Sequence, residues 1–161
     1  MLLDPYARSL FFPFDFRRNG SIGRGANVGR APLGALPFSN SVFDWSGESQ
    51  TRHASDTVIY EMHIRGFIKR TNSGVSPDKR GTFTGVVEQN PYLKELGITA
   101  LELIPMFQYD PDEGNYSGYM PLNLFSPHQS YATNSQTAER LPNSRRWKRN
   151  SIEPESKCFS T

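Results

Sequence analysis

Two runs in the middle of the chain decide the fold, Val58-Ile59-Tyr60-Glu61-Met62-His63-Ile64-Arg65-Gly66-Phe67 and Ile98-Thr99-Ala100-Leu101-Glu102-Leu103-Ile104-Pro105. Each run begins with β-branched residues and is mostly apolar, which is typical of a buried strand. A helical pattern lies between them, from Gly81 to Gly97. Strand, helix and strand at this spacing predict a parallel βαβ unit with a right-handed crossover. The sequence therefore indicates an α/β fold for its central part.

The predicted helix has two parts, because Pro91 lacks the backbone N–H that an unbroken helix requires. Asn90 is expected to be the N-cap of the second part, with Pro91 in the first helical position. Gly97 is expected to end the helix in the left-handed conformation. The side chains expected to face the sheet are Val86, Val87, Leu93 and Leu96.

Residues 1–55 precede this unit and have no sustained hydrophobic period. Four phenylalanines between Phe11 and Phe16 predict a short strand, which Pro13 would confine to a sheet edge. Residues 17–30 are rich in Gly, Asn and Arg and are predicted to form a mobile loop. The glycines of this loop superficially suggest a phosphate cradle, but the sequence predicts no helix after them, which such a cradle needs.

Composition excludes several classes of protein. The net charge is +2, and residues 134–161 hold six Lys or Arg against three Glu, so the basic excess belongs to the tail. A single cysteine, Cys158, excludes an internal disulfide and fits a reducing compartment. No run approaches the roughly 18 apolar residues of a membrane span, and residues 1–5 lack the features of a secretory signal. We expect a cytoplasmic protein, or a plastid protein if a transit peptide has been lost with the N-terminus.

Five segments follow one another along the chain in a specific order. They are Val58 to Phe67, Gly81 to Gly85, Pro91 to Gly97, Leu101 to Pro105 and Asn115 to Tyr119. Together they resemble the start of the catalytic barrel of isoamylase-type glycogen debranching enzymes, which belong to the α-amylase superfamily, glycoside hydrolase family 13. A complete (β/α)₈ barrel takes about 250 residues. The resemblance therefore implies an incomplete fragment of a (β/α)₈ TIM barrel, with its first two strands and first helix.

The resemblance also implies a division of the chain into three parts. Residues 1–55 are a linker and pre-barrel segment of irregular structure, in which Phe43-Asp44-Trp45 resembles a signature just before the first barrel strand. Residues 56–134 are the start of the (β/α)₈ catalytic barrel. Residues 135–161 resemble no part of the family and are predicted to be disordered or out of frame, because they lack the apolar residues that a packed structure needs.

The function implied by the resemblance is hydrolysis of α-1,6 branch points in glycogen or starch, so the expected partner is an α-glucan. Retaining glycoside hydrolysis needs two carboxyl groups about 5 Å apart. The acids on the predicted strands are Glu61 and Glu102, which we expect to be buried short of the strand ends and paired with Arg or backbone. In the family the catalytic Asp, Glu and Asp lie on later strands. We therefore expect no catalytic residue here and an inactive chain.

The resemblance places a sugar platform after the second strand. Tyr119 is expected to stack on a glucosyl ring, and Asn115 and Asn123 are expected to support this substrate-binding site. Ser117 departs from the family pattern, in which Trp is usual at this position. His63 is expected to be a hydrogen-bonded barrel histidine, and His128 is expected to lie in a loop. The sequence shows no metal-ligand cluster and no phosphate cradle, so neither a metal nor a cofactor is expected.

Two alternative functions remain open from the sequence. The first is a non-catalytic module that contacts carbohydrate through Tyr119. The second is a nucleic-acid or anionic-partner binder that uses the basic run Arg145-Arg146-Trp147-Lys148-Arg149. This run is short and flanked by acids, so we expect no nucleic-acid partner and no membrane partner. We also expect Val58, Ile59, Leu101 and Leu103 to lack packing partners in so short a barrel piece.

Overall fold

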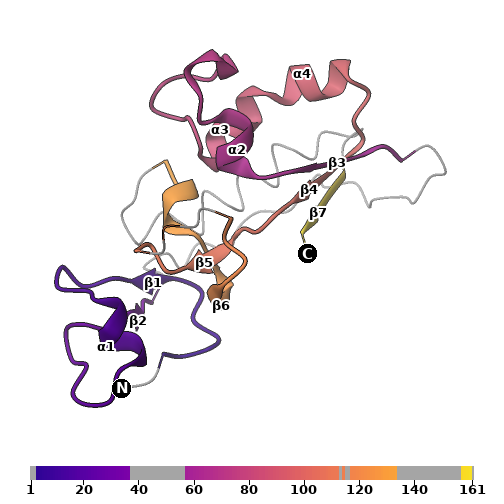
Figure 1. The fold of residues 1–161 in the computed structure, drawn as a ribbon. Coiled ribbons are helices and arrows are strands. Elements are labelled where there is room, and N and C mark those ends of the chain that lie inside the picture. Colours follow the sequence, from indigo (N-terminus) through magenta and orange to yellow (C-terminus); the bar gives the residue numbers. More distant parts are fainter. Residues whose placement is uncertain (1–2, 37–56, 113, 115–116, 134–156, 161) are drawn as a thin grey trace.

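The structure is a computed structural model, and it describes residues 3–36, 57–112, 114, 117–133 and 157–160. The elements in chain order are β1 (Leu10–Phe11), α1 (Arg18–Ile22), β2 (Leu33–Gly34), β3 (Ile59–Met62), α2 (Ile64–Ile68), the 3₁₀ helix η1 (Thr71–Ser73), α3 (Phe83–Glu88), α4 (Asn90–Glu95), β4 (Ala100–Leu103), β5 (Phe107–Tyr109), β6 (Pro121–Pro127), the 3₁₀ helix η2 (Gln129–Tyr131) and β7 (Lys157–Ser160). Figure 1 shows their arrangement. The Phe43-Asp44-Trp45 motif, Asn115 and the basic run 145–149 lie outside the described residues.

The central sheet has three parallel strands in the order β3-β4-β7 (Figure 1). Ile59 pairs with Ala100 and Met62 pairs with Leu103, so the parallel pairing predicted for the two apolar runs is confirmed. The third strand comes from the predicted disordered tail, whose Lys157 pairs with Ala100. The prediction of disorder is therefore wrong for residues 157–160. The free edge of β4 offers a row of backbone donors and acceptors that a short segment can pair with, whatever its composition.

The strand β3 is shorter than predicted, because a helix begins directly after it. The His63 ring takes the N-cap position of α2, where its Nδ1 accepts a hydrogen bond from the Gly66 N–H at 3.2 Å. The backbone from Ile64 onward can then satisfy its donors within the helix rather than in the sheet. Of the apolar run that continues to Phe67, only Ile59–Met62 therefore forms a strand.

The two-part helix is confirmed, with α3 and α4 meeting just before Pro91. The N-cap of α4 is Gln89 rather than the predicted Asn90, which is already helical, and Pro91 follows within the first turn. The Thr82 hydroxyl caps α3 by accepting from the Gly85 N–H at 3.3 Å. Gly97 ends α4 with φ +74, as predicted, and its N–H donates to the Lys94 carbonyl at 2.9 Å.

The hydrophobic core lies between this sheet and the helices. Its buried members are Met62, Ile64, Ile68, Val75, Phe83, Val86, Leu93, Leu101, Leu103 and Tyr131. The predicted lack of partners is thus wrong for Leu101 and Leu103, which α-helical side chains cover, whereas Val58 and Ile59 are about half exposed as predicted. Leu96, predicted to face the sheet, is 48% exposed, because it is the C-cap residue where α4 has already ended.

The N-terminal segment forms a small unit of its own. Strand β1 pairs with β2 in antiparallel register, but it covers only Leu10–Phe11, so the strand predicted over Phe11 to Phe16 is found only at its first residue. Helix α1 lies inside the stretch predicted to be a loop, so that prediction is wrong for residues 18–22. The Arg17 N–H donates to the Arg30 carbonyl at 3.2 Å, which closes residues 17–30 into a compact turn structure.

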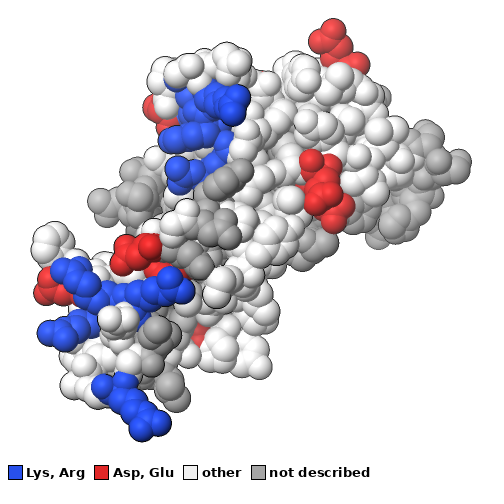
Figure 2. Space-filling model, viewed as in Figure 1, with Lys and Arg blue, Asp and Glu red and all other residues white. Residues whose placement is uncertain are grey.

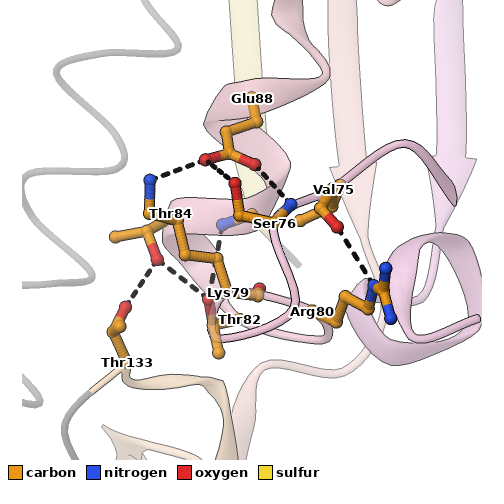
Figure 3. Close-up of polar contacts among 9 residues, drawn as sticks. Val75, Ser76, Lys79, Arg80, Thr82, Thr84, Glu88 and Thr133 are labelled. Carbon is orange, nitrogen blue, oxygen red and sulfur yellow. Dashed lines mark hydrogen bonds and ion pairs between the residues drawn. The ribbon is translucent and has the colours of Figure 1, made fainter. Parts of the chain in front are cut away.

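A polar network fixes the loop between α2 and α3 (Figure 3). The Glu88 carboxylate accepts from the Ser76 N–H at 2.9 Å, from the Ser76 hydroxyl at 3.1 Å and from the Lys79 ammonium at 2.6 Å. On the other side of the loop the Arg80 Nε donates to the Val75 carbonyl at 3.0 Å. One helical carboxylate therefore holds a turn that has no regular structure of its own.

This network predicts a pH-dependent stability. The hydrogen bond from Lys79 and the backbone N–H of Ser76 lower the pKa of Glu88 from its usual value. A carboxyl whose pKa is lower in the folded state stabilises the fold above its unfolded-state pKa, and this contribution is lost as the pH falls through the folded-state pKa. We expect Glu88→Gln to lower the free energy of unfolding at neutral pH, and the difference from wild type to shrink progressively as the pH falls below about 4.

Urea unfolding followed by circular dichroism over a pH series would measure this effect. Asp78→Asn removes an exposed acid from the same loop and is the matched control. A Glu88→Gln difference that stays constant down to acid pH would contradict the role of the ionised carboxylate.

Candidate functional site

The surface that the sequence marks for function lies on a hairpin after β4. Strands β5 and β6 pair antiparallel, with Gln108 opposite Asn123 and Tyr109 opposite Pro121. The loop between them carries Tyr119, whose side chain is 65% exposed. The backbone pairing of β5 with β6 therefore holds both ends of this loop in place.

The start of this loop is anchored by Asp110, which is 6% exposed. One carboxylate oxygen accepts from the Asp112 N–H at 2.9 Å, and the other lies 3.5 Å from the Arg18 Nε. The first contact makes a local turn, and the second ties the hairpin to the N-terminal segment. The loop is therefore held at its base before it reaches the exposed tyrosine.

The backbone beside Tyr119 packs directly on an aromatic ring. Gly118 has φ +76, and a Cβ on it would lie 3.1 Å from the Tyr109 Cδ1 and 3.5 Å from the Pro105 Cγ. Only glycine satisfies both the left-handed backbone and this close approach. Gly118 thus holds the backbone next to Tyr119 closely against the Tyr109 ring.

Tyr109 belongs to a column of stacked and edge-on aromatic rings that extends from the hairpin into the hydrophobic core. Tyr109 stacks on His128 with the ring centres 3.8 Å apart, and His128 lies 5.2 Å from Tyr131. Tyr131 in turn packs edge-on against Phe83 at 5.8 Å and lies within hydrogen-bond distance of His63, 3.2 Å from hydroxyl to Nε2. Because these rings are closely packed, the column holds the hairpin in a fixed position relative to the hydrophobic core.

The protonation of this column follows from its hydrogen bonds. The His63 Nδ1 accepts from the Gly66 N–H, so a neutral ring carries its proton on Nε2 and donates it to the Tyr131 hydroxyl. Burial, together with Tyr109, raises the pKa of Tyr131 well above its usual value. The prediction that His63 is a hydrogen-bonded histidine is confirmed. His128 lies in the connection between β6 and η2, as predicted for a loop residue, but it is 3% exposed and its Nδ1 caps η2 by accepting from the Ser130 N–H.

The structure separates the roles of the predicted site residues. Tyr119 is exposed, whereas Asn123 is 3% exposed on the same hairpin. The Asn123 Nδ2 donates to the carbonyls of Asp4 and Pro5 at 3.3 and 3.1 Å, and its Oδ1 accepts from the Phe125 N–H at 2.7 Å. A direct contact between Asn123 and a sugar is incompatible with this arrangement. Asn123 instead fastens the N-terminal segment to β6.

A second exposed aromatic surface was not found from the sequence. Tyr6 is 72% exposed and packs against Phe125, 55% exposed, with the ring centres 5.4 Å apart. The two residues are far apart in the sequence, and the hydrogen bonds of Asn123 are what bring them together. No local pattern in the sequence signals this contact.

The two strand acids differ from the sequence prediction. Glu61 and Glu102 pair in register on neighbouring strands, and each is the last but one residue of its strand. Glu61 is exposed and Glu102 is half-buried, so the prediction of two buried acids is wrong. They lie on the sheet face opposite the helices, because their neighbours Met62 and Leu103 belong to the core and side chains alternate along a strand.

Two further properties concern only the described part of the chain. Within it, no three His, Cys, Asp or Glu side chains are grouped so that they could hold a metal ion. Among its helices, none has the length and apolar character that crossing a membrane requires.

Comparison with solved structures identifies the fold. The chain superposes on a pullulanase from Paenibacillus barengoltzii with a TM-score of 0.73 at 23% identity, covering 99% of this chain and 25% of that one. It superposes on the catalytic module of a multi-modular glycogen-degrading pneumococcal virulence factor, SpuA, with a TM-score of 0.76 at 22% identity and the same coverage. These neighbours are barrel enzymes, and this chain has the fold of part of such a barrel.

Sequence comparison identifies closer relatives. The chain is 35% identical over 141 residues to the chloroplastic isoamylase 1 of Oryza sativa subsp. japonica, covering 83% of this chain and 17% of that protein. It is 35% identical over 155 residues to an isoamylase of Pseudomonas amyloderamosa, covering 83% and 19%, and 31% identical over 159 residues to the glycogen operon protein GlgX homolog of Mycobacterium bovis, covering 84% and 22%. No protein-family model matches the chain.

Sequence and fold together place the chain among the proteins of glycoside hydrolase family 13, in the α-amylase superfamily. Within that class the chain is a fragment of the isoamylase type, as its sequence segments predicted. The chain spans about a fifth of the length of the curated relatives that it matches.

Proposed function

We propose that this chain is a fragment of a debranching enzyme for α-1,6 linkages in glycogen or starch, that it contacts α-glucan through Tyr119, and that it has no hydrolytic activity by itself. The relatives support the substrate class, because they are isoamylases and a glycogen operon protein. The observation that carries the proposal is the exposed Tyr119 ring on a loop seated on Tyr109.

An exposed tyrosine ring on a loop held in this way is chemically suited to contact a sugar. The face of a phenol ring covers the C–H surface of a glucosyl unit, and the hydroxyl remains able to form a hydrogen bond. Because Gly118 and the ring column fix the backbone, less conformational freedom is lost when a sugar binds. A preorganised aromatic platform therefore binds more tightly than the same ring on a free loop.

The finer assignments belong to the same proposal. Strands β3 and β4 are the first two barrel strands, and α3 and α4 together are the first barrel helix. The chain divides into a linker and pre-barrel segment (residues 1–55), the start of the catalytic barrel (residues 56–134) and a C-terminal tail (residues 135–161). Asn115 supports the Tyr119 platform, and Asn123 positions the hairpin that carries it. The protein acts in the cytoplasm or in a plastid. The plastid location is supported by the chloroplastic isoamylase among its relatives.

We expect Tyr119→Ala to weaken glycogen binding by about fivefold or more, which corresponds to about 1 kcal/mol of ring–sugar contact. Tyr119→Phe keeps the ring face and should retain most of the affinity. Affinity gel electrophoresis in glycogen-containing gels would measure the dissociation constants.

Tyr92→Ala is the matched control, since Tyr92 is a 46% exposed tyrosine on α4, outside the hairpin. If Tyr119→Ala migrated like the wild-type chain at every glycogen concentration, the platform assignment would have to be withdrawn.

A further inference from the structure

The N-terminal segment contains a cavity that the glucan proposal does not use. It has a volume of about 300 Å³ and lies between α1 and the turns that follow it. Its charged and amide lining residues are Arg17, Asn19, Arg24, Asn27 and Arg30, and the others are glycine or alanine. Its lining includes the glycines that superficially suggest a phosphate cradle in the sequence, and in the structure β1 precedes these glycines and Gly20 lies within α1.

The charge of the lining has one sign. Three arginines and two asparagines line the cavity, and no Asp or Glu does. Residues 3–36 as a whole hold five Arg against two Asp, with no Lys or Glu. Figure 2 shows the basic side chains gathered over the part of the molecule where Figure 1 draws α1. Binding of a neutral glucan gives no reason for this concentration of guanidinium groups.

Close backbone contacts give the cavity its shape. A Cβ on Gly20 would lie 2.7 Å from the Arg30 Cβ and 3.0 Å from its carbonyl oxygen, and a Cβ on Gly23 would clash with the Asn19 carbonyl oxygen. The Arg17 N–H donates to the Arg30 carbonyl at 3.2 Å. Two of the three arginines are thus joined through their backbones, so the cavity is a feature of the folded segment.

The neighbouring arginine has a different partner. The Arg18 Nε lies 3.5 Å from the Asp110 carboxylate, and Arg18 is not among the lining residues. An acid therefore lies beside the arginine outside the cavity, whereas Arg17, Arg24 and Arg30 line the cavity with no acid among its lining residues. The Arg17 Nη1 donates to the Phe16 carbonyl at 2.8 Å, which leaves Arg24 and Arg30 as the arginines that the proposal uses. Guanidinium groups recognise phosphate oxygens by paired hydrogen bonds.

We propose that this cavity binds a phosphate monoester carried by a sugar. Its volume lies at the lower end of the range of about 300–1,000 Å³ for small-molecule pockets, so it fits a ligand the size of one phosphorylated monosaccharide unit. Arg24 and Arg30 hold the phosphoryl oxygens, and the Asn19 amide contacts the sugar hydroxyl groups. The phosphoryl group belongs either to a free sugar phosphate or to a phosphorylated unit of a glucan chain.

Equilibrium dialysis of the 161-residue chain against radiolabelled glucose 6-phosphate tests this proposal. We expect saturable binding that weakens as salt is added, and a loss of affinity of about tenfold or more for each of Arg24→Gln and Arg30→Gln. Arg24→Lys keeps the charge without the paired donors and should lose less than Arg24→Gln. Arg8→Gln removes an exposed arginine of the same segment that does not line the cavity, and it should bind like wild type.

Unlabelled competitors separate the possible sources of the phosphoryl group. Stronger displacement by glucose 6-phosphate identifies a free sugar phosphate, and stronger displacement by phosphorylated maltodextrin identifies a modified glucan; either order upholds the site. Equal displacement by unphosphorylated glucose, or an equal loss in Arg8→Gln, would overturn it. Tyr119→Ala should leave this binding unchanged, so failure of the glucan platform and failure of the anion site are distinguishable.

Discussion

The purified chain is expected to release no reducing ends from glycogen or amylopectin above a buffer control. Glycosidases of the retaining type need a nucleophilic carboxylate and a second carboxyl that donates a proton, held about 5 Å apart around the substrate. The acids on neighbouring described strands, Glu61 and Glu102, lie in register on the sheet face opposite the described helices, and Glu61 is exposed. An exposed carboxyl group does not exclude water or hold a sugar between itself and a second carboxyl group.

The large rate enhancement of enzymes makes this expectation easy to test. A working enzyme exceeds the uncatalysed rate by at least about a millionfold, so even a poorly active chain would be detected. A reducing-end assay with branched and debranched glucans should be run with Glu61→Gln and Glu102→Gln. Release of reducing ends that either substitution abolishes would show that these two acids form a catalytic pair.

Phe83→Ala is expected to lower the free energy of unfolding by about 3–5 kcal/mol. Phe83 is 1% exposed, begins α3 and packs edge-on against Tyr131 with the ring centres 5.8 Å apart. Truncation leaves a cavity at the point where α3 meets the ring column under the hairpin. Small domains are stabilised by only about 5–15 kcal/mol in total, so this substitution removes a large fraction.

Urea unfolding followed by far-ultraviolet circular dichroism would measure the loss. Phe14→Ala is the matched control, because the Phe14 side chain is fully exposed and its removal should change the free energy little. Equal stability of the Phe83→Ala and Phe14→Ala chains would mean that the core is not packed around Phe83.

Much of the central fold was predictable because it is encoded locally. Apolar runs at strand spacing, a proline that divides a helix and a glycine that ends it each act over a few residues, and the parallel βαβ unit follows from their order. The family resemblance placed Tyr119 on a loop after the second strand, and in the structure it is exposed on the loop between β5 and β6, two strands that the sequence did not predict.

The errors arose where distant or competing contacts decide the structure. His63 caps a helix and so ends β3 early, although its neighbours have strand-forming residues. The burial of Asn123 depends on the carbonyls of Asp4 and Pro5, more than 100 residues away. The pairing of β7 with β4 depends on an open sheet edge rather than on the sequence of residues 157–160. None of these leaves a periodic signal in the sequence.

The contact between Tyr119 and α-glucan is tested most directly by fluorine NMR of the chain labelled with fluorinated tyrosine. The Tyr119 resonance is assigned by its absence from the Tyr119→Phe chain, and maltoheptaose is then added in steps. A ring face that stacks on a sugar changes its local magnetic environment, so the resonance of the exposed Tyr119 should shift saturably while that of Tyr92 on α4 stays in place. A Tyr119 resonance that does not move at saturating maltoheptaose, or a shift confined to other tyrosines, would contradict the proposed function.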